Sequence, residues 1–516
     1  MKLSKNINKE YLFSKDNNLL KFSKIGIEKE SLRVLNSRIS NKPHDSDLFG
    51  SPLLNKFITT DFSESLLEFI TPPYKEHKKT LKFLDSVHQN VSNKFSKEIL
   101  WPLSMPPFID KDSNIPIAYY GNSDEALFKK VYRNGLSNRY GRQMQTIAGI
   151  HYNYSLDDEL LTRLFSKYSK IDYKEKNTIY FGALRNLLRF NWLLLFLFGA
   201  SPFVSKNIVG KNDSRFYKLD EKTFFMPYAT SLRMSDIGYQ NTKQSDLDIS
   251  FNSVEHYIKG LRKATKTHSK YFENISHIKG QEYPQINSNI LQIEDEYYST
   301  SRPKSSMESD NRMINKLDKY GVNYIELRSI DLNPFQSTGI DIETMQFLEI
   351  FILYCMFKPS PKISKSRMSD IRKNDLLVST KGRQPGLKLL YDKKSITLDD
   401  WAIEVLNELQ EFACIIDSKN SFLLQVISDS KLKVFNKDLT LSSQVLNGVK
   451  DKKLSYEEFG MALGKAHRDY YKKTGVIDRK SNSIIEKEIS ASIKKEKQLK
   501  SHTEKSFKKY LENYFN

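Results

Sequence analysis

Acidic side chains recur in segments with strand-like alternation, where apolar residues are the usual occupants. The segments are 25–30, 58–70 and 323–328, and their acids are Glu28, Glu30, Asp61, Glu68 and Glu326. On a strand, alternate residues share a face, so Glu28 and Glu30 point together, away from the neighbouring isoleucines. Carboxylate oxygens are the ligands that hard divalent cations prefer. The pattern predicts a Mg²⁺ or Mn²⁺ site on the polar face of a sheet.

Two further residues extend this predicted site. His151 lies in the alternating segment 150–154, and imidazole suits Mn²⁺ better than Mg²⁺. Six ligands exceed the needs of one octahedral ion, which predicts two or three ions bridging a nucleoside triphosphate. Arg328 shares a face with Glu326 and could stabilise charge during phosphoryl transfer. One acid alone is more often half of an ion pair, and Arg328 is equally compatible with a salt bridge to Glu326; three acidic segments together favour the metal site.

Two other segments have the residue types that bind anions or amino acids. The segment 132–146 is rich in Arg, Tyr, Gln and Gly, whose forked and amide hydrogen bonds suit such ligands. It is equally compatible with a phosphate-binding loop or an RNA-facing loop. In 230–239, Arg233 and Tyr239 flank a predicted turn, where either could hold a carboxylate or simply be ordinary loop polarity.

Strands and helices alternate up to about residue 335. A helical period marks 79–95 and 172–199, and strand-like alternation marks 150–154 and 285–296. Prolines make 101–107 an extended loop. Strands mixed with separate helical blocks predict an α+β fold rather than a doubly wound sheet.

Beyond residue 340 the pattern is mainly helical, and a lysine-rich helix is expected from residue 484 onward. We expect a catalytic core at 1–340 and a mainly helical C-terminal region at 341–516 packed on it. The other expected helices in this region are 343–357, 398–412 and 455–474.

Composition and the absence of certain motifs limit the kinds of function that the protein can have. The 516 residues include 81 Lys and Arg against 62 Asp and Glu, a net charge of +19. This charge admits a basic RNA- or membrane-binding protein, but the lysines are scattered and lack zinc-finger or RNP-type signatures, which favours a compositional bias of the surface. The absence of G-x-G-x-x-G and Walker A sequences excludes those two nucleotide-binding scaffolds.

Compartment signals agree with a soluble, cytoplasmic protein. The only cysteines, Cys355 and Cys414, form no metal-ligand spacing or disulfide framework, which fits a reducing cytoplasm. The N-terminus is polar and lacks the apolar core of a signal peptide. The apolar run 190–198 is too short to span a bilayer and is expected to be a buried helix.

Seven segments in chain order resemble bacterial glutamate–cysteine ligase of the free-standing type. The resemblance covers roughly the first two thirds of the chain. The segments are 25–34 (IGIEKESLRV), 58–72 (ITTDFSESLLEFITP), 101–106 (WPLSMP), 138–155 (NRYGRQMQTIAGIHYNYS), 227–239 (PYATSLRMSDIGY), 285–294 (QINSNILQIE) and 324–335 (YIELRSIDLNPF).

The resemblance implies a fold related to glutamine synthetase. In that fold a curved, mostly antiparallel sheet holds ATP, metal and substrates on its concave face and is surrounded by helices. It also implies that ATP, L-glutamate and L-cysteine give γ-glutamylcysteine, ADP and phosphate through γ-glutamyl phosphate, the first step of glutathione synthesis. Positioning and charge neutralisation would suffice for this chemistry, without a covalent nucleophile on the protein.

By position, the resemblance also assigns roles to single residues. Arg328 would lie against the phosphates, with Glu326 beside it in the catalytic centre, and Arg133 would meet glutamate or phosphate. Arg233 would pair with the cysteine carboxylate. The metal ligands would be Glu28, Glu30, Asp61, Glu68, His151 and Glu326, and the cysteine pocket would include Phe62, Tyr132, Leu136, Gln145, Tyr239 and Tyr298.

Other ligases related to this family would be distinguished by the residues of the pocket that binds the acceptor amine. A sister ligase that joins glutamate to another amine would share the ATP and metal residues but differ around Tyr132, Arg233, Tyr239 and Tyr298. A bifunctional enzyme that also makes glutathione would need a second ATP-binding domain, for which 516 residues leave little room. Binding of nucleic acid or membranes is not expected, and the protein is expected to be a monomer.

Overall fold

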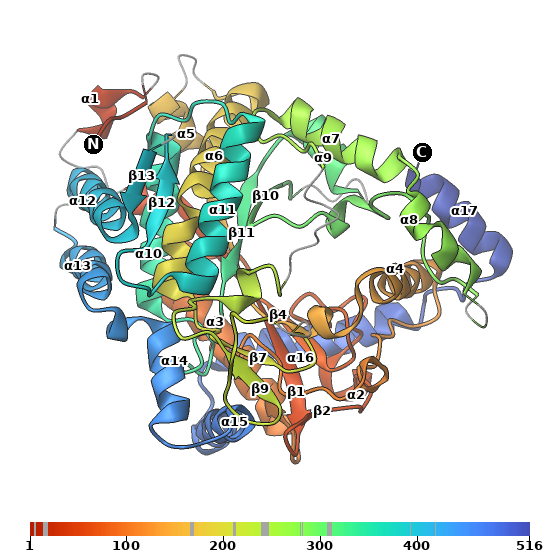
Figure 1. Cartoon of the computed structure of the whole chain (residues 1–516). Helices are drawn as coiled ribbons and strands as arrows, with labels where there is room; N and C mark the ends of the chain where they lie inside the picture. Colours follow the sequence, from red (N-terminus) through yellow and green to blue (C-terminus); the bar gives the residue numbers. More distant parts are fainter. Residues whose placement is uncertain are drawn as a thin grey trace.

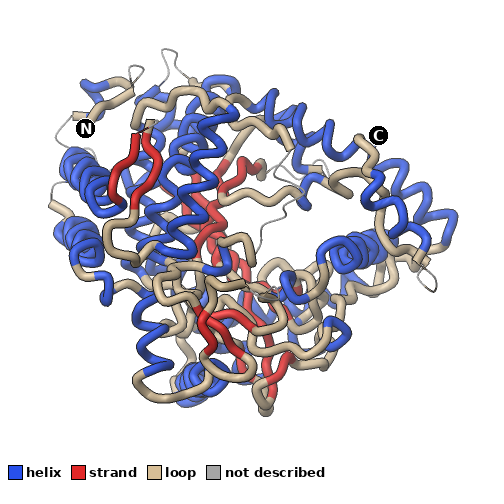
Figure 2. Tube along the Cα trace, viewed as in Figure 1, coloured by secondary structure: helices blue, strands red, loops and turns tan. Residues whose placement is uncertain are grey.

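The computed structural model describes the chain except residues 5–6, 14–18, 166–169, 210–212, 239–246, 279, 281, 307–311, 393, 418 and 516. Its centre is an open eight-stranded sheet in which every pairing is antiparallel (Figures 1 and 2). The strand order is β10 (Ser301–Lys304), β11 (Tyr324–Ile330), β6 (Ile150–Leu156), β1 (Ser23–Leu35), β4 (Leu66–Ile70) and β3 (Ile58–Thr60), with β2 (Arg38–Ile39) and β5 (Ile99–Leu100) paired to β1.

The predicted mixture of helices with an antiparallel sheet is confirmed. The predicted strands at 25–30, 150–154 and 323–328 are present as parts of β1, β6 and β11. The segment 58–70 is a β3–β4 hairpin, so Asp61 lies just past β3 instead of on a strand. The strand expected at 285–296 is wrong: this stretch is irregular except for one isolated bridge from Asn289 to His268 and the short 3₁₀ turn Glu294–Glu296. Its polar side chains bind neighbouring backbone instead of a ladder.

Strand β1 separates two environments by simple alternation. Ile25 and Ile27 are fully buried on the face covered by helices. Lys29 follows them onto that face, where its Nζ lies 3.0 Å from Nε2 of His88 in α3 (His77–Lys94). Burial lowers the pKa of Lys29 to about 7. Glu28 and Glu30 point to the opposite face, as the alternation predicts.

Three helices cover the back of the sheet. They are α3, α6 (Tyr173–Phe198) and α10 (Ile342–Phe357), and α11 (Lys365–Lys381) packs on α6. Within the described residues, α6 is the one helix long and apolar enough to cross a membrane, but 89% of its most apolar window is buried. A helix that is apolar on every side and covered by protein is a core helix, which confirms the expected buried helix around 190–198.

Smaller elements complete the first part of the chain. The helices are α1 (Lys9–Leu12), α2 (Ser46–Phe49), α4 (Asp124–Tyr140), α5 (Asp158–Phe165), α7 (Val254–Lys266), α8 (Lys270–Glu273) and α9 (Met313–Tyr320). Strands β7 (Phe203–Ser205), β8 (Tyr217–Lys218) and β9 (Thr223–Phe225) form a small separate sheet.

After α11 the chain is helical apart from the hairpin of β12 (Lys388–Tyr391) and β13 (Lys394–Thr397). The helices expected at 343–357, 398–412 and 455–474 are confirmed. The single terminal helix expected from residue 484 is wrong, because α16 begins earlier and a break separates it from α17. The helices are α12 (Leu398–Asp417), α13 (Ser421–Phe435), α14 (Leu441–Lys450), α15 (Tyr456–Lys473), α16 (Arg479–Glu496) and α17 (Glu504–Phe515).

The C-terminal helices reach both faces of the sheet. Helices α15 and α16 pack on α3 behind it, whereas α17 packs on α4, on the other side (Figure 1).

A buried carboxyl group in α11 gives a pH prediction. Asp375 is 8% exposed and accepts a 2.9 Å hydrogen bond from Asn191 Nδ2, while no described group donates to its Oδ1. Burial raises the pKa of Asp375 to about 8, against about 4 in an unfolded chain. Ionisation therefore favours unfolding, and its cost grows as pH rises from about 4 to 8.

We expect Asp375→Asn to raise the Tm at pH 8 and to change it little at pH 5, because asparagine can still accept from Asn191 without carrying charge. Thermal unfolding at several pH values measures this. The exposed Asp451→Asn is the control for removal of one charge. A Tm difference that is the same at pH 5 and pH 8 would contradict the account.

Candidate functional site

The register of the sheet brings together acids that are far apart in the sequence. Glu28 lies opposite His151, Glu30 lies opposite Glu68, and Glu326 lies opposite Asn153. Directly opposed residues in an antiparallel pair project from the same face. Four neighbouring strands, β11, β6, β1 and β4, therefore contribute polar side chains to one patch on the face away from α3 and α6.

Contacts within the patch are close. His151 Nδ1 lies 3.0 Å from Glu28 Oε2, and Nε2 lies 3.7 Å from Glu30 Oε1. Asn153 Nδ2 donates to Glu28 Oε1 at 2.8 Å. Glu28, His151 and Glu326 each place one possible metal-ligating atom within 4.8 Å of the others. This spacing is suitable for a cation bound between them.

The carboxylates of the patch lie close enough together to raise one another's pKa. Burial and the neighbouring Glu28, Asp61 and Glu30 raise the pKa of Glu68 well above its ordinary value. The pKa of Glu30 is raised as well, chiefly by burial. Mutual repulsion of this kind between crowded, partly buried carboxylates is what a divalent cation would relieve. The donor set therefore fits Mg²⁺ or Mn²⁺.

Glu326 behaves differently because two cations flank it. Its carboxylate lies 3.2 Å from Lys304 Nζ and 3.3 Å from Arg328 Nη1. Burial acts to raise the pKa of Glu326, but Lys304 and Arg328 outweigh it, so the pKa lies below its ordinary value. Glu326 is thus an anion at the boundary between the carboxylates and a positively charged wall.

Lys304 and Arg302 in β10 extend that wall, and neither residue was among the predicted site residues. Arg302 lies opposite Glu326 in the register, and both basic side chains line the same pocket as Glu326. Arg302 and Lys304 are two residues apart, as are Glu326 and Arg328 on the next strand, so each pair shares one face of its strand. This spacing is the sequence signal that could have identified the two basic residues as members of the site.

A pocket of about 650 Å³ opens over the patch. All the predicted site residues line it except Arg233 and Tyr239, and Tyr239 lies outside the described residues. Those lining it are Glu28, Glu30, Asp61, Phe62, Glu68, Tyr132, Arg133, Leu136, Gln145, His151, Tyr298, Glu326 and Arg328. The structure therefore brings the residues predicted for metal, phosphate and acceptor into one cavity.

Arg233 lies behind the pocket wall. It is 3% exposed, its Nη2 donates to the backbone oxygen of Arg328 at 2.8 Å, and its Nη1 lies 3.6 Å from Asp331. A Cβ at Gly149 would lie 2.0 Å from Arg233 Nη2, so this position needs glycine for the guanidinium to fit. In this structure Arg233 supports the strand that carries Arg328, and its predicted contact with a substrate carboxylate stays a prediction.

Helix α4 forms the pocket wall that faces the sheet. The loop predicted at 132–146 is wrong for 132–140, because α4 continues to Tyr140. The side chain of Ser123 caps the helix by accepting a hydrogen bond from Ala126 N. Asp124 and Glu125 occupy the first turn, where their negative charges interact favourably with the positive end of the helix dipole. Arg133 in this helix donates from Nε to the backbone oxygen of Asp61 at 2.6 Å. This bond ties the helix to the β3–β4 hairpin.

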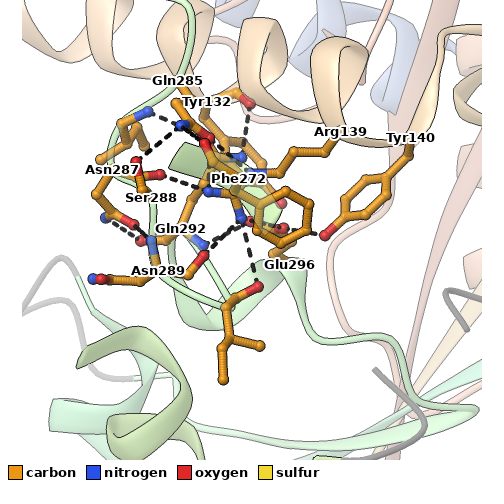
Figure 3. A network of polar contacts seen from close by, with 12 residues as sticks. Tyr132, Arg139, Tyr140, Phe272, Gln285, Asn287, Ser288, Asn289, Gln292 and Glu296 are labelled. Carbon is orange, nitrogen blue, oxygen red and sulfur yellow. Dashed lines mark hydrogen bonds and ion pairs between the residues drawn. The ribbon is translucent and has the colours of Figure 1, made fainter. Parts of the chain in front are cut away.

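A buried network around Arg139 joins α4 to the irregular segment 285–296 (Figure 3). Arg139 Nη1 lies 3.0 Å from Glu296 Oε1, and Arg139 Nε donates to Gln285 Oε1 at 3.0 Å. The guanidinium stacks on Phe272 at 4.1 Å. Tyr140 donates to the same Glu296 oxygen at 2.5 Å. This network fixes the backbone near Tyr132 and Tyr298, two predicted members of the acceptor pocket.

The pocket also contains residues from the other end of the chain. Tyr510 and Tyr514 of α17 line it, together with Glu125 and Lys129 of α4. A spacing of four residues places the two tyrosines on one helix face, but nothing local in the sequence indicates what that face covers. Long-range packing of α17 on α4 decides their position.

Comparison with known structures defines the class of the protein as a ligase. The chain matches the crystal structure of glutamate–cysteine ligase from Francisella tularensis in complex with AMP, with a TM-score of 0.89, 33% identity and 98% coverage of both chains. The glutamate–cysteine ligase family model matches residues 10–378. The chain belongs to the glutamate–cysteine ligase family, whose members catalyse the formation of γ-glutamylcysteine, the first step of glutathione synthesis.

Sequence relatives give the same result. The chain is 41% identical to a glutamate–cysteine ligase from Pseudomonas fluorescens over 453 residues, which cover 87% of this chain and 85% of that protein. It is 40% identical to one from a Janthinobacterium species over 459 residues, which cover 88% and 87%.

Proposed function

We propose that this protein joins the γ-carboxylate of L-glutamate to the amino group of L-cysteine and converts ATP to ADP and phosphate. The observation that carries the proposal is the partly buried carboxylate patch faced by Lys304 and Arg328 at the floor of a pocket of about 650 Å³. The complex of the Francisella tularensis relative with AMP supports nucleotide binding by this chain. The acids and cations suit a triphosphate substrate accompanied by divalent metal.

In this proposal Mg²⁺, or Mn²⁺, is bound by the acidic patch. A divalent ion held there would neutralise phosphate charge and polarise a phosphoryl oxygen. The pKa of Glu68, which is raised by burial and neighbouring acids, supports the fit because cation binding would offset that repulsion. The residues that would hold the metal are Glu28, Glu30, Asp61, Glu68, His151 and Glu326.

The reaction needs positioning more than covalent chemistry on the protein. The glutamate γ-carboxylate attacks the γ-phosphorus, the bond to ADP breaks, and γ-glutamyl phosphate forms. The cysteine amine then displaces phosphate, which leaves far more readily than oxide or hydroxide would. Arg328 and Lys304 are placed to stabilise the negative charge on the transferring phosphoryl group.

The acceptor would bind at the part of the pocket lined by Phe62, Tyr132, Leu136, Gln145 and Tyr298. These side chains offer apolar and hydroxyl or amide groups suited to a small thiol-bearing amino acid. Arg233 and Tyr239 are retained as predicted members of this subsite. Arg133, stacked on Tyr120 at 4.5 Å, is proposed to contact glutamate or phosphate.

We also propose the broader features that the family resemblance implies. The pocket face would be the concave face of a glutamine-synthetase-like sheet, which is supported by helices α3, α6 and α10 covering the opposite face. The catalytic core would be 1–340, with 341–516 as a C-terminal region packed on it. The protein would act as a monomer in the cytoplasm, without nucleic acid or membrane.

An amine panel tests the function. Purified protein with Mg²⁺, ATP and glutamate should release phosphate fastest with cysteine, and the product should be γ-glutamylcysteine by mass spectrometry. The matched amines are serine, alanine and 2-aminobutyrate, which separate the thiol from side-chain size. Phosphate release that is independent of cysteine and its close analogues would refute the substrate assignment and favour a sister carboxylate–amine ligase.

A further inference from the structure

A second cavity lies on the face of the sheet that the helices cover, away from the carboxylate patch. Its volume is about 850 Å³, within the range of small-molecule sites, roughly 300–1,000 Å³. It lies where α10 contacts both α3 and α13, and the 3₁₀ turn Leu19–Phe22 contributes to its wall. Among the described residues it shares no lining residue with the pocket over the patch, and none of the roles proposed above uses it.

Three helices of fifteen or more residues begin at this cavity. Residues at the starts of α3, α10 and α13 line it: Glu76, His77, Ile342 and Asn420. The first N–H groups of a helix lack partners inside the helix, and its dipole is positive at this end, so helix starts attract anions. Glu343 offsets the dipole of α10, but α3 and α13 have no acid in their first turns, and Glu76 makes no side-chain capping bond. Two positive helix ends are therefore available to an anion.

Lysine side chains surround the opening of the cavity. All three are exposed, and they are Lys21, Lys75 and Lys78. Lys75 lies 3.0 Å from Asp157, whereas the other two make no ion pair with a described residue. The acid on this rim, Glu76, lies 2.5 Å from Lys79. The rim therefore has two lysines free to neutralise an anionic ligand.

The floor of the cavity contains an amide without a partner. Gln346 is 8% exposed, lines the cavity and makes no hydrogen bond to any described residue. Glu349, one turn further along α10, accepts from Ser23 and lies 3.3 Å from Nε2 of His77. Burial raises the pKa of Glu349 to about 8 and lowers that of His77 to about 4, so this pair is largely uncharged at neutral pH. Since buried amides are normally hydrogen-bonded, Gln346 indicates a ligand with polar groups of its own.

We propose that this cavity binds a phosphate monoester, with the phosphate near Lys21, Lys78 and the starts of α3 and α13, and the organic part against Gln346. A phosphate monoester carries nearly two negative charges at pH 7 and offers three strong acceptor oxygens, which suits several donors converging on one group. The amide of Gln346 can both donate to and accept from hydroxyl groups of the organic part. This inference goes beyond the proposed function and does not depend on it.

Calorimetric titration of the purified protein with glycerol 3-phosphate tests the site without nucleotide or amino acids. We expect Lys21→Gln/Lys78→Gln to raise the Kd by about ten-fold or more, because charge-assisted contacts are lost. Gln346→Met keeps the length of the side chain and should raise the Kd about five-fold. Lys487→Gln/Lys494→Gln removes the same charge from exposed positions of α16 and should bind like the wild type. Circular dichroism checks that each variant is folded.

Hydrogen exchange locates the bound ligand, since the pocket over the patch can also attract phosphate. Glycerol 3-phosphate should slow exchange at the starts of α3, α10 and α13 in the wild type but not in Lys21→Gln/Lys78→Gln. Inorganic phosphate should bind more weakly, and glycerol should not bind. Protection confined to β1, β6 and β11, or equal affinity of the two double-lysine variants, would overturn the site. Binding of citrate without binding of glycerol 3-phosphate would overturn the assignment to a phosphate monoester.

Discussion

Replacing Glu326 with glutamine is expected to lower kcat by about a thousand-fold, the scale seen when a key electrostatic group of a catalytic site is lost. Glu326 is buried and is held between Lys304 at 3.2 Å and Arg328 at 3.3 Å. A neutral amide removes one anionic ligand from the patch and leaves both cations without their carboxylate. Phosphate release at saturating Mg²⁺, ATP, glutamate and cysteine measures the effect.

A matched variant distinguishes loss of chemistry from loss of a buried ion pair. Glu98 is also buried, 3.3 Å from Arg33 and 3.6 Å from Lys42, and it does not line the pocket. Glu98→Gln should lower the Tm and leave kcat near the wild-type value. Circular dichroism should show that Glu326→Gln remains folded. A near-normal rate for folded Glu326→Gln at saturating Mg²⁺ would remove Glu326 from the proposed metal site.

The second large effect concerns stability. Arg139→Met is expected to lower the free energy of unfolding by about 3–5 kcal/mol, because it leaves Glu296 as a buried charge without its cation. The substitution also removes the donors that Gln285 and the backbone near Asn287 accept from. Urea denaturation followed by circular dichroism measures the loss. We also expect a higher KM for cysteine, since the segment 285–296 and α4 frame the acceptor pocket.

Two controls sharpen this result. Arg262→Met removes a partly exposed arginine, 2.7 Å from Asp318, and should change the free energy of unfolding by less than about 1 kcal/mol. Adding Glu296→Gln to Arg139→Met should restore part of the lost stability, because the buried negative charge that lost its arginine is then absent. If Arg139→Met unfolds at the same urea concentration as Arg262→Met, the network in Figure 3 does not hold the pocket wall together.

Features encoded by local alternation were predictable from the sequence. The period of two in 25–30 and 323–328 places Glu28, Glu30, Glu326 and Arg328 on the polar face, and the structure lines one pocket with all four. The long helical periods also match α3, α6, α10 and α15 closely. In the strands, in α3 and in α15 one face of the element is apolar, whereas α6 and α10 contain long apolar runs. Both patterns are visible in residues that are neighbours along the chain, so no knowledge of distant contacts is needed.

Features encoded by distant contacts were not predictable. The segment 285–296 alternates like a strand, yet Asn287 donates to the backbone of its own segment, and the side chain of Gln285 accepts from Arg139 of α4. The pocket-facing position of Tyr514 depends on α17 packing against α4, nearly four hundred residues earlier in the chain. Such pairings leave no periodic signal. The predicted division near residue 340 stays a prediction.

The alternation along β1 also has a consequence for how the chain folds. Shifting this strand by one residue against β6 would press Glu28 and Glu30 into the apolar layer of α3 and bring Lys29 among the carboxylates. Two desolvated carboxylates cost several kcal/mol, so mispaired intermediates are disfavoured. The same two acids proposed to bind metal therefore select the correct strand pairing before any ligand is present, and neutral substitutions at both positions should slow refolding by permitting the shifted register.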